Sequence, residues 1–169
     1  AGITEIARPV GVVAAVVPST NPAATPANNI INALKCGNAV IVAPSPKGHS
    51  TSTLLLDFVR TELKRVGAPL DLVQQLPAPI TRELTNELMK EADLVVVTGS
   101  QNNVRAGYSS GTPALGVGTG NVAGIVDDSG DCADAARKIM ASKIFDHATS
   151  CSSENALIIH EAVYDRMVA

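Results

Sequence analysis

The side chain with the clearest chemical potential is the thiol of Cys151, in the segment Thr149-Ser150-Cys151-Ser152-Ser153. Small hydroxyl residues on both sides leave a thiol open to an electrophile and supply donors that stabilise a thiolate, as a cysteine nucleophile requires. The alternative is a buried structural cysteine. That alternative suits Cys36 and Cys132 better, because both lie in helical patterns beside Ala or Leu residues.

Other candidates stand at the ends of predicted strands. Thr98, Gly99 and Ser100 join a strand to a short helix, where free N–H groups and the helix dipole favour a phosphate. A plain β-to-α turn is the alternative. Asn21 lies just past the first strand, and its amide can donate to a developing oxyanion. A turn-forming Asn-Pro is the commoner explanation.

Two further features carry weaker signals. The glycines at 116, 118 and 120 do not fit the G-x-G-x-x-G pattern, and they indicate only that the backbone approaches something closely. We interpret Glu154 as a solvated loop carboxylate rather than a base. His147 is interpreted as a loop residue, because the base for a cysteine usually comes from elsewhere in the fold.

Short β-branched runs alternate with longer helical patterns along the chain. This alternation is typical of an α/β fold with a mostly parallel sheet and crossover helices. Strands are expected at 12–17, 39–43, 72–76, 94–97, 122–126 and 156–159, and helices at 26–36, 54–66, 81–91 and 135–144. The polar segment 145–155, which carries Cys151, has no periodicity and is expected to be a loop.

Composition excludes several classes of function. The net charge is −3, with two Phe, two Tyr and no Trp, so the chain lacks a basic surface and stacking platforms for nucleic acid. No apolar run reaches the roughly 18–20 residues that span a bilayer, and no signal peptide is evident, so no membrane partner is expected. Three cysteines without C-x-x-C and three scattered histidines disfavour disulfides and a metal site.

The order of several segments resembles the aldehyde dehydrogenase superfamily over nearly the whole chain. These segments are Pro9-Val10-Gly11-Val12-Val13 with Pro18 and Asn21-Pro22, then Val97-Thr98-Gly99-Ser100, the glycine segment, and a Cys in a polar loop. The CoA-acylating branch, of sulfoacetaldehyde, succinate-semialdehyde or acetaldehyde type, is most similar. Its features are Asn21-Pro22 with Thr25, Tyr108 to Ala114 followed by Gly116-Val117-Gly118, and Phe145-Asp146 followed by Cys151-Ser152-Ser153-Glu154.

The resemblance implies NAD- or NADP-dependent oxidation of a small aldehyde to an acyl-CoA, with coenzyme A as co-substrate. Cys151 would attack the aldehyde, and the Asn21 amide and the Cys151 N–H would hold the oxyanion of the thiohemiacetal. Hydride transfer then leaves a thioester on Cys151. The cofactor-binding residues expected on this basis are Pro18, Ser19, Thr98, Gly99, Ser100, Gly116 and Gly118. No metal is expected.

Two departures from the family pattern refine this expectation. Hydrolytic members carry a Glu-Leu-Gly-Gly segment whose glutamate activates water, and the corresponding stretch here is Gly116-Val117-Gly118-Thr119. Without that base the thioester should pass to CoA. Hydrolytic members also carry a lysine and often a glutamate after the second strand, where this chain has Ala43-Pro44-Ser45-Pro46. No carboxylate there repels a 2′-phosphate and Lys47 could favour one, so NAD and NADP both stay open.

Length implies that the chain is a fragment of such an enzyme. We expect a Rossmann-like sheet with helices on both faces in a dinucleotide-binding domain at 1–130. The first piece of a second α/β domain, which carries the nucleophilic cysteine, is expected at 131–169. The isolated chain is expected to have no appreciable turnover. The full-length enzyme is expected to be a cytoplasmic homo-oligomer, with a bacterial microcompartment as the alternative address.

Three other functions stay open at this point. A hydrolytic aldehyde dehydrogenase or a glutamyl-phosphate reductase-like enzyme would share the superfamily's architecture. A non-catalytic nucleotide-binding fragment, with Cys151 as an inert or redox-sensing thiol, is the third. The product formed, whether acyl-CoA or free acid, and the use of an acyl phosphate distinguish the three kinds of enzyme. The rate at which Cys151 is alkylated distinguishes a reactive thiol from an inert one.

Overall fold

The computed structural model describes residues 2–169, and the chain divides into two compact units between Gly118 and Thr119. The division falls earlier than the expected boundary at residue 130. The reason is that strand β6 (Val122–Val126) pairs with β7 (Glu154–Ile159) in a sheet of their own, instead of joining the strands that precede it.

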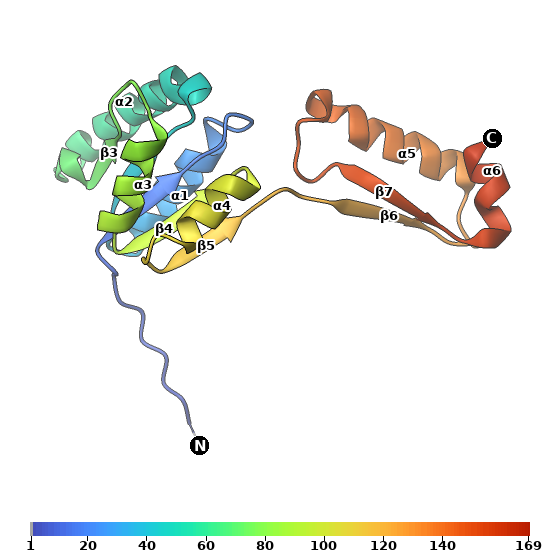
Figure 1. Ribbon diagram of the computed structural model, residues 1–169, viewed down its shortest axis with the longest axis horizontal. Coiled ribbons are helices and arrows are strands. Elements are labelled where there is room, and N and C mark those ends of the chain that lie inside the picture. Colours follow the sequence, from blue (N-terminus) through green and yellow to red (C-terminus); the bar gives the residue numbers. More distant parts are fainter. Residues whose placement is uncertain (1) are drawn as a thin grey trace. The chain divides into compact units, whose positions relative to one another are not determined.

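Five parallel strands form the sheet of the first unit, in the order β3-β2-β1-β4-β5 (Figure 1). Their bounds are β1 Val12–Val16, β2 Ala39–Ala43, β3 Val73–Gln75, β4 Leu94–Thr98 and β5 Ala114–Val117. The chain builds outward from β1 to β3, then returns to place β4 on the other side of β1. The strand order therefore reverses between β1 and β4, and in open parallel sheets ligands bind outside the carboxyl ends of the strands at such a reversal.

Helices cover both faces of this sheet. Along β1, Val13 and Ala15 face one apolar core and Ala14 and Val16 face the other, because successive side chains of a strand point to opposite faces. The first core is shared with α1 (Ala24–Lys35) and α2 (His49–Arg65), and the second with α3 (Arg82–Glu91) and α4 (Gln101–Tyr108). Burial on both faces explains the unbroken apolar run of β1. The predicted fold class is confirmed.

Side-chain caps begin three of the helices. Thr81 accepts a hydrogen bond from the Leu84 N–H at α3, and Ser100 accepts one from the Asn103 N–H at α4. Asp131 does the same at α5 (Cys132–Ile144). Each such cap contributes about 1 kcal/mol. The helix beginnings after β3 and β4 therefore follow directly from the sequence.

The second unit consists of two parallel strands, β6 and β7, and α5, followed by the short α6 (Tyr164–Val168). Its core is small: the buried apolar residues are Val126, Cys132 and Val163. The pairing passes from Val122 opposite Glu154 to Ala123 opposite Ala156, so Asn155 is an extra residue that bulges out of β7. Short 3-10 turns lie at Pro46–Gly48 and Leu70–Leu72 in the first unit and at Phe145–Ala148 and Glu161–Val163 in the second.

No helix in residues 2–169 is both long and apolar enough to cross a membrane.

Candidate active site

Cys151 lies in an exposed turn between α5 and β7. The Ser150 and Ser152 hydroxyls lie 2.7 Å apart, and the Ser153 N–H and Oγ both donate to the Ser150 carbonyl, at 3.2 and 3.0 Å. These bonds close a tight turn around the cysteine. Within residues 2–169 the Cys151 N–H makes no hydrogen bond, so it is available as a donor to a ligand.

The backbone of the segment that precedes Cys151 is strained. Asp146, His147 and Ala148 all have positive φ, at 50°, 53° and 58°, a region that costs a non-glycine residue roughly 1–2 kcal/mol. Thr149 holds the strained segment, since its Oγ1 donates to the Asp146 carbonyl at 2.6 Å and to Asp146 Oδ2 at 2.9 Å. Backbone strain of this kind clusters at functional sites, and here it directly precedes the candidate nucleophile.

Gly120 supports the Cys151 backbone from the other side. A Cβ at Gly120 would collide with the Cys151 carbonyl oxygen and would lie 3.3 Å from its carbonyl carbon. The close approach predicted from the glycine cluster is therefore, at this position, an approach to the cysteine itself. Only glycine fits without a shift of backbone.

Gly116 and Gly118 approach α4 instead. A Cβ at Gly116 would lie 2.8 Å from side-chain atoms of both Tyr108 and Val104, and the Tyr108 hydroxyl accepts a hydrogen bond from the Gly116 N–H at 3.1 Å. A Cβ at Gly118 would lie 3.2 Å from the Gln101 amide. A side chain at position 116 would have to displace Tyr108 and Val104, whereas one at position 118 would displace only the end of the Gln101 side chain.

Asn21 follows β1 in the first unit and is exposed. Its Oδ1 accepts a hydrogen bond from the Ala24 N–H at 3.1 Å, at the start of α1. The side-chain oxygen therefore has the turn role that an Asn-Pro pair suggests. Within residues 2–169 the Nδ2 hydrogens make no hydrogen bond, so they remain available as donors, and the two interpretations of Asn21 are compatible.

The predicted cofactor residues lie at the carboxyl ends of β1, β4 and β5, three neighbouring strands. Pro18 and Ser19 follow β1, and Thr98 to Ser100 follow or end β4, so both groups stand at the strand-order reversal. Gly99 has a φ of +151°, and a Cβ there would lie 3.8 Å from Pro18 Cβ, which brings these two residues together.

These residues fit a dinucleotide phosphate. Gly99 and Ser100 present only small side chains at the amino end of α4, and the first turn of α4 holds no acidic residue. The N–H groups and the positive end of the helix dipole therefore face no competing charge on that turn.

Two sequence-based interpretations are wrong. Cys36 is exposed rather than buried, because α1 ends at Lys35 and leaves Cys36 at its carboxyl end. Glu154 is the first residue of β7 and half-buried rather than a solvated loop residue, and its Oε2 is buried without a hydrogen-bond partner. Its pKa is lowered by a hydrogen bond from its own backbone N–H and another from the Ser142 side chain.

Two polar residues near Cys151, Lys143 and Asn155, were not predicted from the sequence. The Lys143 ammonium, on the last turn of α5, donates to Asn155 Oδ1 at 2.8 Å and to Ser153 Oγ at 3.4 Å. Asn155 reaches this position as the bulge residue of β7. A bulge in a parallel pair leaves no pattern in the sequence, so only the strand register could reveal it.

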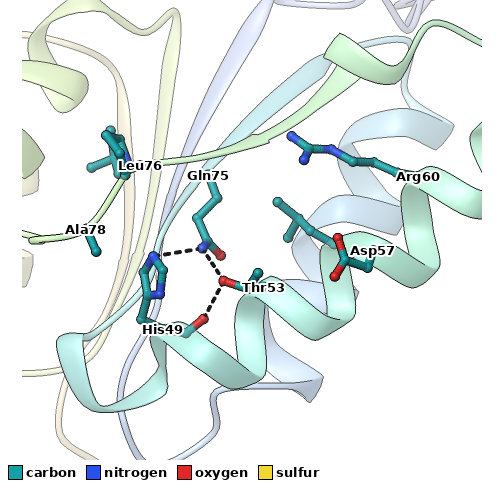
Figure 2. Close-up of a pocket in the computed structure, with 9 residues that line it drawn as sticks. His49, Thr53, Asp57, Arg60, Gln75, Leu76 and Ala78 are labelled. Atoms are coloured by element: carbon teal, nitrogen blue, oxygen red, sulfur yellow. Dashed lines mark hydrogen bonds between the residues drawn. The ribbon is translucent and has the colours of Figure 1, made fainter.

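A separate hollow of about 240 Å³ lies between α2 and the end of β3 (Figure 2). In Figure 2 the Gln75 amide points toward His49 and Thr53, and Gln75 Nε2 lies 3.1 Å from His49 Nε2 and 2.9 Å from Thr53 Oγ1. Arg60 donates to the Val73 carbonyl from Nε and Nη2. None of the predicted site residues lines this hollow. Residues 2–169 contain no group of three His, Cys, Asp or Glu side chains placed to hold a metal.

The first unit has the doubly wound sheet of Rossmann-like nucleotide-binding proteins, and the second presents an exposed cysteine. A doubly wound sheet binds ligands outside the carboxyl ends of its strands, and an exposed thiol has the access that a nucleophile needs. Residues 2–169 match the aldehyde dehydrogenase family, and the chain belongs to that family. The resemblance inferred from the sequence is confirmed.

Several relatives with similar sequences are named as acylating or acetylating dehydrogenases. The chain is 67% identical over 168 residues to sulfoacetaldehyde dehydrogenase (acylating) of Cupriavidus necator, covering 99% of the chain and 34% of that protein. It is 44% identical over 164 residues to succinate-semialdehyde dehydrogenase (acetylating) of Clostridium kluyveri, covering 97% of the chain and 36% of that protein. The chain thus spans about a third of the length of the curated relatives it matches.

Solved enzyme structures superpose closely on this chain. Propionaldehyde dehydrogenase of Rhodopseudomonas palustris with bound propionyl-CoA superposes with a TM-score of 0.87 at 32% identity, covering 95% of this chain and 36% of that one. Another structure of that enzyme holds CoA and an acylated cysteine. An engineered glycolyl-CoA reductase with bound NADP+ superposes with a TM-score of 0.88 at 32% identity, covering 95% of this chain and 37% of that one.

Proposed function

We propose that this chain supplies the dinucleotide-binding part and the nucleophile of an enzyme that oxidises an aldehyde to an acyl-CoA. Support comes from relatives named as acylating dehydrogenases and from a similar structure that holds an acylated cysteine. The exposed thiol of Cys151, in a turn with a free N–H, is the local feature that fits this role.

The proposed reaction begins with attack of the Cys151 thiolate on the aldehyde carbon. A C–S bond forms as the carbonyl π pair moves to oxygen, and the Cys151 N–H donates to the resulting oxyanion. Asn21 Nδ2 is proposed as the second donor, on the family resemblance and on its free amide hydrogens. A nicotinamide held at the carboxyl ends of β1 and β4 would supply the hydride acceptor, so that the thiohemiacetal carbon would lose its hydride and Cys151 would be left as a thioester.

The proposal that the acyl group passes to CoA rests on one observation, the packing around Gly116. Hydrolytic relatives have a glutamate at the corresponding position, and a side chain here would meet Tyr108 and Val104 at 2.8 Å. Without a base to activate water, the thioester waits for a stronger nucleophile. The CoA thiolate attacks the thioester carbonyl, the Cys151 thiolate leaves, and acyl-CoA departs.

Either NAD or NADP is proposed as the oxidant. The 3-10 turn after β2 contains the exposed Lys47 and no carboxylate. A carboxylate there would select NAD by binding the ribose hydroxyls and repelling a 2′-phosphate. Its absence makes NADP acceptable, and a similar engineered structure holds NADP+.

The test is an assay of the protein expressed from its full reading frame, with a panel of small aldehydes including sulfoacetaldehyde, with and without CoA. We expect NAD(P)H formation that depends on CoA, with thioester as product and no activity in Cys151→Ser. Free acid formed equally without CoA would contradict the proposal. Oxidation of NADPH by an acyl phosphate but not by an acyl-CoA would instead identify a glutamyl-phosphate reductase-like enzyme.

A further inference from the structure

One ammonium group links both sides of the Cys151 turn. Lys143 is half-buried, and its Nζ donates to Asn155 Oδ1 at 2.8 Å and to Ser153 Oγ at 3.4 Å. Hydrogen bonds from a charged donor are stronger than neutral ones, particularly where water is partly excluded.

The first link runs through Ser153. This residue is 3% exposed, and its hydroxyl accepts from Lys143 while donating to the Ser150 carbonyl at 3.0 Å. The Ser153 N–H donates to the same carbonyl at 3.2 Å. Lys143 therefore orients the hydroxyl that closes the turn on one side of Cys151.

The second link runs through Asn155. Its Oδ1 accepts from Lys143, and its Nδ2 donates to the Gly120 carbonyl at 3.3 Å. Gly120 in turn lies against the Cys151 carbonyl, with no space for a Cβ. An amide carries both the acceptor and the donor that this bridge needs, whereas a carboxylate would lack the donor.

The bulge in β7 makes this arrangement available. Because Asn155 is the extra residue opposite Val122, its side chain reaches Lys143 on the last turn of α5. In a regular strand, neighbours would point to opposite faces. Bulges are enriched beside active sites, where they redirect a side chain.

We propose that Lys143 and Asn155 are positioning residues for Cys151, which fix its backbone from both sides during thiol attack and acyl transfer. This proposal rests on the proposed function of Cys151 as the nucleophile. Neither side chain needs to touch the substrate, because both act through Ser153 and Gly120.

The test compares Lys143→Met, Lys143→Arg and Asn155→Ala in the protein from the full reading frame. Lys138→Met is the matched control, since Lys138 lies on the same helix but forms only an exposed ion pair with Asp134. Hydrogen exchange is measured over residues 149–155, and kcat and KM are measured with aldehyde, cofactor and CoA. A thermal melt shows that each variant is folded.

We expect Lys143→Met and Asn155→Ala to accelerate exchange of the turn about tenfold and to lower kcat about tenfold or more, with the cofactor KM within about twofold of wild type. Lys143→Arg should restore much of the slow exchange and much of kcat. The double variant of Lys143→Met and Asn155→Ala should have a kcat no more than about twofold below that of either single variant. Lys138→Met should match wild type.

Equal exchange rates over residues 149–155 in Lys143→Met and Lys138→Met would overturn the proposal that Lys143 stabilises the turn. Faster exchange with unchanged kcat would overturn the positioning role. A wild-type protein without aldehyde turnover, but with the exchange difference intact, would overturn the proposed function while leaving the bracing of Cys151 supported.

Discussion

Replacing Gly120 by alanine places one methyl group against the backbone of the candidate nucleophile. The added Cβ would overlap the Cys151 carbonyl oxygen and lie 3.6 Å from its Cβ. Gly120 has no left-handed φ, so alanine meets no backbone strain of its own and the effect is steric. The obstacle is backbone, which cannot rotate away as a flexible side chain would.

The magnitude follows from that overlap. Relief to an ordinary contact requires the two segments to separate by about 1 Å. A misplacement of this size costs a catalytic group about 10²-fold in rate, and the overpacking costs about 1–3 kcal/mol of stability. We therefore expect Gly120→Ala to lower kcat about 100-fold, with the cofactor KM within about twofold of wild type.

The assay is steady-state formation of NAD(P)H at saturating aldehyde and CoA. Gly130→Ala is the matched control, because the nearest atom to its added Cβ is the Asp127 carbonyl oxygen at 3.5 Å, an ordinary contact. Turnover of Gly120→Ala within about twofold of Gly130→Ala would refute the argument that Gly120 sets the position of Cys151.

Three further predictions concern strain, titration and cofactor choice. Ala148→Gly should raise the free energy of unfolding by about 1 kcal/mol in denaturant melts, because Ala148 has a φ of 58°, whereas Ala141→Gly inside α5 should lower it by about 1 kcal/mol. The pKa of Glu154 lies below its ordinary 4.5, so its stabilising effect is complete above that value and is lost as pH falls through the lowered pKa. Glu154→Gln should therefore remove part of the difference in denaturant midpoint between pH 6 and pH 3, and an unchanged difference would contradict this. Lys47→Glu should shift the kcat/KM preference from NADP toward NAD about tenfold, and Lys64→Glu, at an exposed position near the end of α2, should not.

The sequence predicts the buried sheet well because its signals are local. The apolar run of β1 and the caps at Thr81 and Ser100 depend on near neighbours, so β1 and α3 begin within one residue of the expected positions. Helices α1, α2 and α5 begin two, five and three residues before the expected positions. Strand β5 was not predicted, because Ala114-Leu115-Gly116-Val117 has a central glycine and no β-branched run. Its glycine is explained only by Tyr108 and Val104, which pack against it.

The sequence points to a candidate nucleophile but not to the residues around it. The hydroxyl neighbours of Cys151 and the family resemblance single out that thiol, whereas the contacts of Gly120, Lys143 and Asn155 join segments up to 35 residues apart. The exposure of Cys36 depends on where α1 ends, and the burial of Glu154 depends on the register of β7. These are properties of packing, which residue type and spacing do not specify.

The central claim is that Cys151 carries the acyl group between the aldehyde and CoA, and intact-mass spectrometry tests it most directly. The protein is incubated with aldehyde and NAD(P)+ without CoA and is then desalted to remove both. Peptide mapping assigns any adduct to a cysteine, and CoA is then added. The account predicts an acyl adduct on Cys151, absent from Cys36 and Cys132, that disappears on CoA addition as acyl-CoA forms in equal amount. An unmodified Cys151, or an adduct released as free acid at a rate independent of CoA, would contradict it.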